Sequence, residues 1–421
     1  MKTIVIGGGA AGMMAAIKAS EKGERVVIFE KNEKLGKKLF ITGKGRCNIT
    51  NNCDADDFFK NVNRNSKFLY SAYNAFDSQA VMEFFEKEGL FLKTERGNRV
   101  FPNSDHSSDV IKSLEKALKI NNVEVRLNTE VRDILADESK NTVTGVLLSD
   151  GSKVSCDRVI VATGGVSYPL TGSTGDGYRF AEKFDITVNK TYPSLVPLCC
   201  SDEWIKEVQG LSLKNVSFCL MNAKKKVFDE QGEMLFTHFG LSGPLILSAS
   251  SLYVENSIKG KCLSGFIDLK PALSEENLDK RILRDFSENN NKAFKNSLDG
   301  LLPKSLIPVI ISKSGINEFT RVNEITREQR KNLVNLLKHL EVNITGTRPV
   351  NEAIITKGGV SVKEINPKTM ESKRVNNLFF AGEVLDLDAM TGGFNLQIAW
   401  CTGACAGTNG KGENYYESDC D

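Results

Sequence analysis

The 421-residue sequence has few histidines, no C-x-x-C cysteine pair and no long apolar run. Three histidines and ten scattered cysteines, none in a C-x-x-C arrangement, give little support for a structural zinc site, so we expect no metal centre. The cysteines are expected to be reduced thiols that pack as small apolar residues.

An excess of charge of one sign is also missing, because 55 lysines and arginines stand against 53 aspartates and glutamates. The net charge of +2 creates no overall field toward nucleic acid or an anionic membrane, and no patch of basic and aromatic residues stands out. No segment reaches the ~20 uninterrupted apolar residues of a membrane helix, and the first residues do not resemble a signal peptide. We therefore expect a cytoplasmic protein with a small-molecule substrate and no nucleic-acid or membrane partner. The sequence leaves its oligomeric state open.

A glycine motif near the N-terminus is the strongest local signal. The stretch TIVIGGGAAG places Gly7, Gly9 and Gly12 in a G-x-G-x-x-G pattern between an expected strand and an expected helix. The first glycine permits a tight turn, the second lets the backbone approach a diphosphate, and the third packs helix against strand. Glu30 ends the next expected strand, where a carboxylate can accept both hydroxyls of an adenosine ribose. This βαβ unit predicts a dinucleotide site on a parallel sheet.

Two more segments combine glycines with polar residues. In GKGRCN (43–48), the glycines would let the chain run close to a flat ligand, so we expect Arg46 to contact it. In DAMTGGFN (388–395), Gly392 and Gly393 precede an expected helix that begins near Asn395. The N-terminus of that helix would present unpaired N–H groups and partial positive charge to a ligand. Because strand and helix signals return at the C-terminus after an antiparallel and helical stretch, the two ends of the chain are expected to form one α/β domain.

Five segments that span nearly the whole chain resemble the BaiN/YhiN-type flavoproteins. The resemblance implies one noncovalent FAD per chain and an α/β fold, with a Rossmann-like FAD-binding domain formed by both termini and a β-barrel-like plus helical insert. The implied domains are 1–190 and 346–421 for FAD binding and 191–345 for the insert, with 191–271 barrel-like and 272–345 helical. The segments are GKGRCNITN (43–51), VIVATGGVSYPLTGSTGDGY (159–178), LFTHFGLSGP (235–244), VNEAIITKGGVSVKEINPKTMESK (350–373) and LFFAGEVLDLDAMTGGFNLQIAWCTGACAG (378–407).

The resemblance also implies which residues contact FAD. They fall into an adenosine end, built on the first βαβ unit, and a flavin end, built on the polar loop after it and on the C-terminal segment. The implied contacts are Gly7, Gly9, Gly12 and Glu30 at the diphosphate and ribose; Val131 at the adenine, with Thr163 and Gly164 nearby; Thr42, Gly43, Arg46, Cys47 and Asn48 along the flavin half; Gly382, Glu383, Asp386, Gly393, Phe394, Asn395 and Leu396 at the ribityl chain and isoalloxazine; and Ala10, Ala11, Lys31 and Lys38 as further contacts.

Three side chains are candidates for catalysis. Arg99 could hold a substrate carbonyl or carboxylate, Tyr168 could donate a proton, and His238 lies in another segment that carries the resemblance. The resemblance favours a reductase in which reduced flavin delivers hydride to the activated C=C bond of a 3-oxo steroid or bile-acid-like enone. The alternatives are an FAD-dependent oxidase of a small amine such as aminoacetone, with O₂ as acceptor, and a non-catalytic FAD-binding redox sensor. No second dinucleotide motif is visible, so NADH or NADPH as electron donor would dock transiently.

Overall fold

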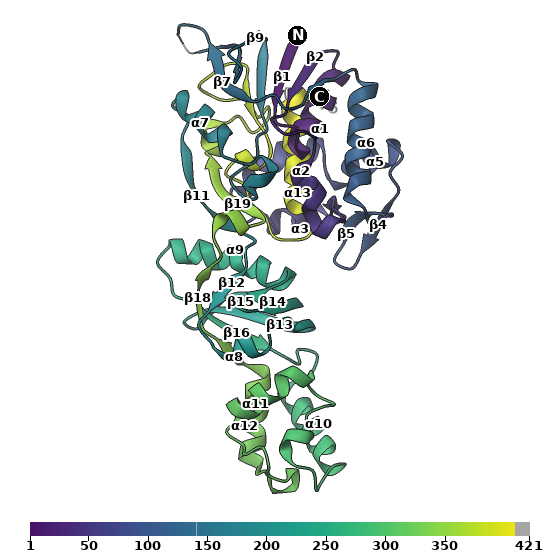
Figure 1. The fold of residues 1–421 in the computed structure, drawn as a ribbon, viewed down its shortest axis with the longest axis vertical. Helices are drawn as coiled ribbons and strands as arrows, with labels where there is room; N and C mark the ends of the chain where they lie inside the picture. The colour runs from purple at the N-terminus through teal and green to yellow at the C-terminus, as the bar shows by residue number, and fades with distance from the viewer. Residues whose placement is uncertain (140, 409–421) are drawn as a thin grey trace, which may run out of the picture. The chain divides into compact units, whose positions relative to one another are not determined.

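The computed structural model describes residues 1–139 and 141–408. The chain divides into two compact units (Figure 1). The first unit comprises Met1–Pro193 and Val350–Asp421, and the second, here called the insert, comprises Ser194–Pro349. These limits lie close to the expected boundaries after residues 190 and 345.

A five-stranded parallel sheet forms the centre of the first unit, in the order β20-β10-β1-β2-β6. The apolar runs TIVI, VVIF and RVIV are buried, as is usual for parallel strands that are covered on both faces. Because β20 comes from the C-terminal part, both ends of the chain build one sheet, and the predicted α/β fold is confirmed. The strands are β1 (Lys2–Ile6), β2 (Arg25–Phe29), β6 (Glu124–Arg126), β10 (Arg158–Val161) and β20 (Leu378–Phe380).

Two helices from opposite ends of the chain, α1 (Ala10–Glu21) and α13 (Phe394–Thr408), pack along each other (Figure 1). Small residues allow this approach, because a Cβ at Gly403 would collide with the carbonyl oxygen of Ala11 and one at Gly407 would lie 2.5 Å from that of Ala15. On another side of α13, the fully buried Trp400 donates from Nε1 to the carbonyl of Ile49 at 2.9 Å.

A buried arginine, Arg158, lies at the C-terminal ends of these two helices. Arg158 is 0% exposed, and its guanidinium donates to the carbonyl oxygens of Ala406 at 3.1 Å and Gly407 at 2.7 Å. Its Nη2 also lies 2.9 Å from a carboxylate oxygen of Glu24, just after α1. The last carbonyl groups of a helix have no partner within the helix. Arg158 therefore satisfies the end of α13 and ties it to β10 and α1.

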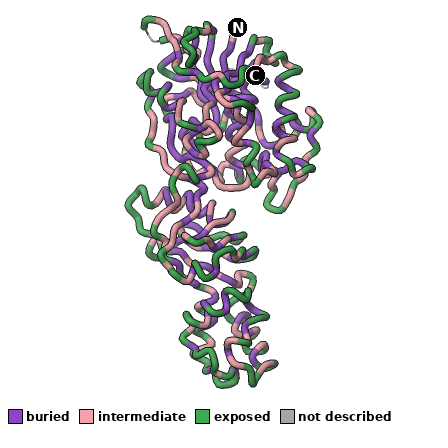
Figure 2. The backbone as a smooth tube through the Cα atoms, in the orientation of Figure 1, coloured by how far each residue is buried: buried purple, intermediate pink, exposed green. Residues whose placement is uncertain are grey.

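The remaining elements of the first unit surround this core, and Figure 2 shows the buried backbone at its centre. They include two small antiparallel sheets, β3-β5-β4 and β7-β8-β9, and the pair β11-β19. Their bounds are α2 (Lys37–Ile41), η1 (Thr42–Gly45), β3 (Thr50–Asn51), α3 (Ala55–Lys60), η2 (Ser66–Leu69), α4 (Tyr70–Ala75), α5 (Ser78–Lys87), β4 (Leu92–Glu95), β5 (Arg99–Pro102), α6 (Ser107–Ile120), β7 (Val131–Ala136), β8 (Val143–Leu148), β9 (Lys153–Ser155), η3 (Pro169–Thr171), α7 (Asp176–Lys183), β11 (Val188–Ser194), η7 (Val350–Glu352), β19 (Ile355–Val360), η8 (Val362–Glu364) and η9 (Gly382–Val384).

The insert has a hydrophobic core of its own beneath a seven-stranded sheet in the order β17-β16-β13-β14-β15-β12-β18. Its described pairings are antiparallel, and among them the two edge strands, β17 and β18, do not pair with each other. The expected barrel-like part is therefore an open sheet rather than a closed barrel. The elements are β12 (Leu198–Cys200), α8 (Trp204–Glu207), β13 (Ser212–Asn222), β14 (Lys225–Thr237), β15 (Gly240–Ser242), α9 (Pro244–Ile258), β16 (Ser264–Asp268), α10 (Glu275–Ser287), η4 (Phe294–Asn296), η5 (Lys304–Leu306), α11 (Ile307–Ser314), η6 (Val322–Glu324), α12 (Arg327–Lys338), β17 (Leu340–Val342) and β18 (Ile344–Thr347).

Candidate cofactor site

The turn between β1 and α1 uses its glycines in two ways. Gly7 has φ +105°, and a Cβ there would lie 2.6 Å from the carbonyl oxygen of Ala162, while a Cβ at Gly12 would collide with the carbonyl of Gly7. Gly9 differs, because no atom lies within 4 Å of the position that its Cβ would take. Gly9 precedes α1, and no side chain caps that helix terminus. The N-terminus of α1 thus offers open space and unpaired N–H groups to a diphosphate.

Glu30 is fixed beside this turn at the carboxyl end of β2. It is 7% exposed, and its Oε2 accepts from the Gly8 N–H at 2.7 Å, while Oε1 accepts from the backbone and side-chain nitrogens of Asn32 at 2.8 and 2.6 Å. The Glu30 carbonyl accepts from the Thr129 N–H at 2.9 Å, which brings buried Val131 at the start of β7 into the same region. The structure therefore gathers the residues predicted for the adenosine end.

Among the buried side-chain atoms that have no hydrogen-bond partner within the described residues are Asn48 Oδ1, Thr163 Oγ1 and the Tyr178 hydroxyl. Leaving such a group unsatisfied costs about 1 to 3 kcal/mol. Asn48 and Thr163 belong to the predicted contacts, and Tyr178 ends the segment 159–178 that carries the resemblance. The sequence did not single out Tyr178, because nothing in it distinguishes an unsatisfied tyrosine from a satisfied core residue. Burial raises the pKa of the Tyr178 phenol, which stays protonated. A ligand as rich in hydrogen-bonding atoms as FAD fits these groups.

At the flavin end, Lys38 and Glu383 bind each other. The Lys38 ammonium pairs with Glu383 Oε2 and donates to Ser167 Oγ at 2.7 Å, and Glu383 Oε1 accepts from Ser167 Oγ and the Thr356 N–H, both at 2.8 Å. This network joins α2, the loop after β10, β19 and η9. Ser167 and Thr356 were not predicted as site residues, and only the three-dimensional contacts reveal their part in it.

Arg46 is also engaged within the protein. Its guanidinium binds Glu95 Oε1 at 2.5 Å and donates from Nε to Asp105 Oδ1 at 2.8 Å, and it lies 4.2 Å from the centre of the Phe101 ring. The hydrogen bonds to Glu95 and Asp105 raise the pKa of Arg46. The expected contact with flavin stays a prediction. The neighbouring Cys47 is 0% exposed, and burial raises the pKa of its thiol.

Contacts within the protein explain why Gly393 and Asn395 stand at the start of α13. Gly393 has φ +100°, and a Cβ there would overlap the backbone of Thr50 in β3. The helix begins one residue before Asn395, whose Nδ2 donates to the carbonyl of Ala389 at 2.8 Å and whose Oδ1 accepts from the Ala389 N–H at 3.0 Å. Asn395 thus holds the preceding loop, and Gly393 permits a close approach of two chain segments.

The other predicted contacts are also held by protein groups. Lys31 pairs with Asp176 at 2.6 Å. Asp386 is 1% exposed, lies 3.1 Å from Arg64 Nη1 and accepts from Asn189 Nδ2 at 2.8 Å. The remaining predicted contacts are assigned only to the elements that contain or precede them. They are Ala10 and Ala11 in the first turn of α1, Thr42 and Gly43 in η1, Gly164 after β10, Gly382 in η9, and Phe394 and Leu396 in α13.

The three catalytic candidates lie in separate segments. Arg99 begins β5 and donates from Nε to the carbonyl of Arg96 at 3.0 Å. Tyr168 precedes η3 with φ +51°, and partial burial raises the pKa of its phenol. His238 is exposed and belongs to the insert. Their catalytic roles therefore stay predictions.

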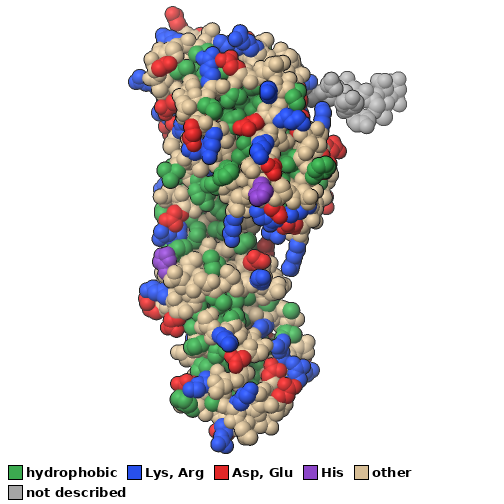
Figure 3. Space-filling view, turned by 45° about the vertical axis from the view of Figure 1, so that its right-hand side comes forward, with side chains coloured by type: hydrophobic (Ala, Val, Ile, Leu, Met, Phe, Trp, Pro, Cys, Tyr) green, Lys and Arg blue, Asp and Glu red, His purple; other side chains and the backbone are tan. Residues whose placement is uncertain are grey.

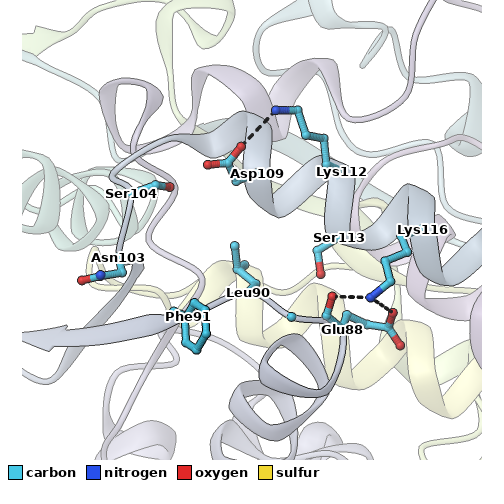
Figure 4. Close-up of a pocket in the computed structure, with 10 residues that line it drawn as sticks. Glu88, Leu90, Phe91, Asn103, Ser104, Asp109, Lys112, Ser113 and Lys116 are labelled. Atoms are coloured by element: carbon cyan, nitrogen blue, oxygen red, sulfur yellow. Dashed lines mark hydrogen bonds and ion pairs between the residues drawn. The ribbon is translucent and has the colours of Figure 1, made fainter.

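A cavity of about 460 Å³ lies elsewhere in the first unit, between the end of α5 and α6 (Figure 4). None of the predicted cofactor or catalytic residues lines it. Its lysines are paired, since Lys116 lies 3.7 Å from Glu88 Oε2 and Lys112 lies 3.2 Å from Asp109 Oδ1. Phe91, which also lines it, is 81% exposed. The lining residues are Glu88, Gly89, Leu90, Phe91, Asn103, Ser104, Asp109, Lys112, Ser113 and Lys116.

Within the described ranges, no three side chains of His, Cys, Asp or Glu come together as metal ligands. No described helix combines the length and apolar character needed to cross a membrane.

Comparison with known proteins matches residues 1–409 to a family model described as HI0933-like protein Rossmann domain. The 3-dehydro-bile acid delta(4,6)-reductase of Clostridium scindens is 31% identical over 406 residues, which cover 96% of this chain and 97% of the relative. The ribosomal RNA dihydrouridine synthase of Escherichia coli is 32% identical over 405 residues, 96% of each chain. The 3-ketosteroid delta1-dehydrogenase of Sterolibacterium denitrificans shares the fold, with a TM-score of 0.50 and 14% identity over 96% of this chain and 98% of that one.

Proposed function

The chain belongs to the HI0933-like family of FAD-dependent oxidoreductases, and from this premise we propose that it reduces a C=C bond conjugated to a carbonyl. The family predicted from the sequence is confirmed. Two relatives of nearly full length bear the names of such reactions, one on a 3-dehydro bile acid and one on uridine in ribosomal RNA. The bond reduced in uracil lies next to a ring carbonyl, as in a steroid enone. This shared chemistry is the observation that carries the proposal.

When bound, FAD supplies the hydride. The residues of this chain would hold it: the open N-terminus of α1 at Gly9 for the diphosphate and Glu30 for the ribose. The substrate carbonyl needs a donor where negative charge develops on its oxygen. Arg99 and Tyr168 are our candidates for that donor. Because burial raises the pKa of Tyr168, its phenol is protonated at neutral pH and can donate.

A 3-oxo steroid or bile-acid-like enone is the first candidate substrate, and the Clostridium scindens relative supports it. Uracil in RNA is the second, supported by the Escherichia coli relative and by a protein of the same name from Haemophilus influenzae, 31% identical over 408 residues. The expectation of no nucleic-acid partner rested on the net charge and on the lack of a basic and aromatic patch in the sequence, and neither excludes RNA. On the face in Figure 3, basic and acidic side chains are interspersed, so charge there favours neither substrate.

Anaerobic stopped-flow absorbance of the purified yellow protein tests the proposal. The flavin is first reduced with NADH or NADPH, either of which we propose as a transient donor, or with dithionite if neither reacts. The reduced protein is then mixed with a 3-oxo-4,6-diene bile acid or with a uridine-containing RNA fragment. Return of the oxidised flavin spectrum, together with the saturated product, supports the proposal and identifies the substrate class.

The same instrument separates the alternatives. Reduction of the flavin by a small amine, followed by reoxidation with O₂ alone, would establish the amine oxidase and contradict the reductase. A flavin that responds to none of these compounds would favour the redox sensor.

A further inference from the structure

The cavity between the end of α5 and α6 contains a buried hydroxyl that packing does not explain. Ser113 in α6 is 6% exposed, and its Oγ has no hydrogen-bond partner among the described residues. A serine inside a helix usually bonds a backbone carbonyl one turn earlier or points to water. Alanine would fill the same space, is a better helix former and would bury no polar group. A partner for this hydroxyl is therefore expected from outside the chain.

The wall that faces Ser113 is apolar. Figure 4 shows the Ser113 side chain pointing from α6 toward the segment after α5, which carries Leu90 and Phe91. Leu90 is buried, whereas Phe91 is 81% exposed although it lines the cavity. An exposed phenyl ring offers a flat surface on which another ring can stack. The cavity thus combines a stacking surface with a hydroxyl that can both donate and accept a hydrogen bond.

The charges of the lining balance. Lys112 is paired with Asp109, and Lys116 with Glu88. A small free anion would gain little here, because the two carboxylates offset the attraction of the two ammonium groups. A steroid would need a mostly apolar pocket, and only two of the lining side chains are large and apolar. The lining therefore suits an uncharged flat ring that carries hydrogen-bonding atoms at its edge.

We propose that this cavity binds a nucleobase, with the ring against Phe91 and a polar edge atom at Ser113. Nucleobases carry donors and acceptors around a flat ring, and every base can stack on an aromatic side chain. Each ammonium group has three donors, so Lys112 and Lys116 at the rim can also bond the ribose or phosphate attached to the base. The volume of about 460 Å³ lies within the range of small-molecule sites, roughly 300 to 1,000 Å³.

The base can belong to a free nucleotide or to single-stranded RNA, because both present the same ring, ribose and phosphate. None of the predicted cofactor or catalytic residues lines the cavity. The inference therefore goes beyond the proposed function and requires no reaction at the flavin.

The test is the affinity of the FAD-loaded protein for two kinds of probe. One is an end-labelled single-stranded RNA hexamer that contains all four bases, followed by fluorescence anisotropy, and the other is each of the four nucleoside monophosphates, followed by calorimetry. Phe91→Ala should weaken binding about tenfold, because the stacking of a base on an aromatic ring is lost. Ser113→Ala should weaken it about fivefold, because one hydrogen bond is lost.

Thermal unfolding of the same variants separates this role from a structural one. Phe91→Ala should leave Tm within error of the wild type, because the side chain is exposed. Ser113→Ala should raise Tm by about 1 to 3 °C, because it removes an unsatisfied buried hydroxyl from a helix. A fall in the Tm of Ser113→Ala would show that the hydroxyl serves the fold and would overturn the inference.

Phe319→Ala is the matched control, because Phe319 is an exposed phenylalanine of the insert that does not line the cavity. Weaker binding of both kinds of probe to Phe91→Ala and Ser113→Ala would support a site for free nucleotides, and weaker binding of the hexamer alone would support a site for single-stranded RNA. The inference is overturned if no probe binds, or if either variant binds every probe as tightly as Phe319→Ala. Affinity is measured with oxidised FAD, so absence of C=C reduction would contradict the proposed function and leave this inference intact.

Discussion

At the adenosine end of the candidate site, Glu30 stands buried beside an open glycine turn, whereas at the flavin end Lys38 and Glu383 bind each other. Arg46 and Asn395 at the flavin end are likewise engaged, one with two carboxylates and the other with the loop before α13. Glu30 is also held by protein groups, so the difference lies in the backbone: the adenosine end keeps an open helix N-terminus at Gly9, whereas Gly393 at the flavin end is packed against Thr50. Substitutions at the two ends should therefore have different consequences.

The largest contrast is expected between two glycines. Gly393→Ala should lower the free energy of unfolding by about 2 to 5 kcal/mol, because φ is +100° and a Cβ would overlap the backbone of Thr50. Gly9 has φ −84° and open space, so Gly9→Ala should leave the stability of the apoprotein within about 1 kcal/mol of wild type and weaken FAD binding. Denaturant unfolding and FAD titration measure the two effects. If Gly393→Ala and Gly9→Ala lowered the free energy of unfolding equally, the proposed difference between the adenosine end and the flavin end would be wrong.

Glu30→Ala should weaken FAD binding by about 1.5 to 3 kcal/mol, the usual value of a hydrogen bond to a charged group. The flavin spectrum should stay nearly unchanged, because the ribose lies far from the ring. Titration of the apoprotein with FAD measures the affinity. Since Glu30 also holds the Gly8 and Asn32 N–H groups, unfolding of the apoprotein serves as the control. Unchanged FAD affinity would mean that Glu30 does not bind the ribose.

Asn395→Asp should lower the flavin midpoint potential, by about 1 to 2 kcal/mol or roughly 20 to 45 mV, if the N-terminus of α13 faces the ring. The new carboxylate also loses the donor that binds the Ala389 carbonyl, so the unfolding free energy must be measured alongside. Lys37→Glu is the control, because Lys37 pairs with Glu33 on a more exposed face and should move the potential far less. A potential within error of the wild type would place the helix away from the flavin.

The smallest effect is expected at Arg46. Its hydrogen bonds lower the pKa of Glu95, and together with Lys93 it lowers that of Asp105. Stability from a lowered carboxylate pKa is present above the unfolded-state pKa, near 4, and is lost as the pH falls through the folded value. Arg46→Gln should therefore lower the Tm slightly near neutrality, because these groups are exposed, and the difference from the wild type should disappear as the pH falls from about 6 to 3. Thermal unfolding over this pH range measures it. Loss of FAD binding in this variant would show that Arg46 serves the cofactor after all.

Sequence reasoning succeeded best where contacts are local. The glycine turn and Glu30 belong to one βαβ unit, and their geometry follows from strand, turn and helix rules. At the flavin end the deciding contacts join distant segments, as between Lys38 and Glu383 or Asn51 and Gly392. From sequence alone, Lys38 looked like a group available to a ligand. Nothing in the order of residues shows that such a charge is already matched.

A local sequence pattern also does not show which neighbour requires a given residue type. The glycine at 393 predicts that another group comes close to the backbone, and we expected a ligand there. In the structure, the group that lies against Gly393 is the backbone of β3. Likewise, the antiparallel pattern of the insert was recognisable, but the openness of its sheet depends on which edge strands pair. In each case the missing information was the identity of a distant neighbour.

The packing of α13 on α1, with Arg158 across its end, has a consequence for biosynthesis. Because α13 is synthesised after all the other described elements, α1 remains with Ala11 and Ala15 uncovered until α13 has been made. The insert has a separate core formed entirely by earlier residues and can fold while synthesis continues. We expect the nascent first unit to be the part that needs protection from aggregation until α13 has emerged and packed on α1.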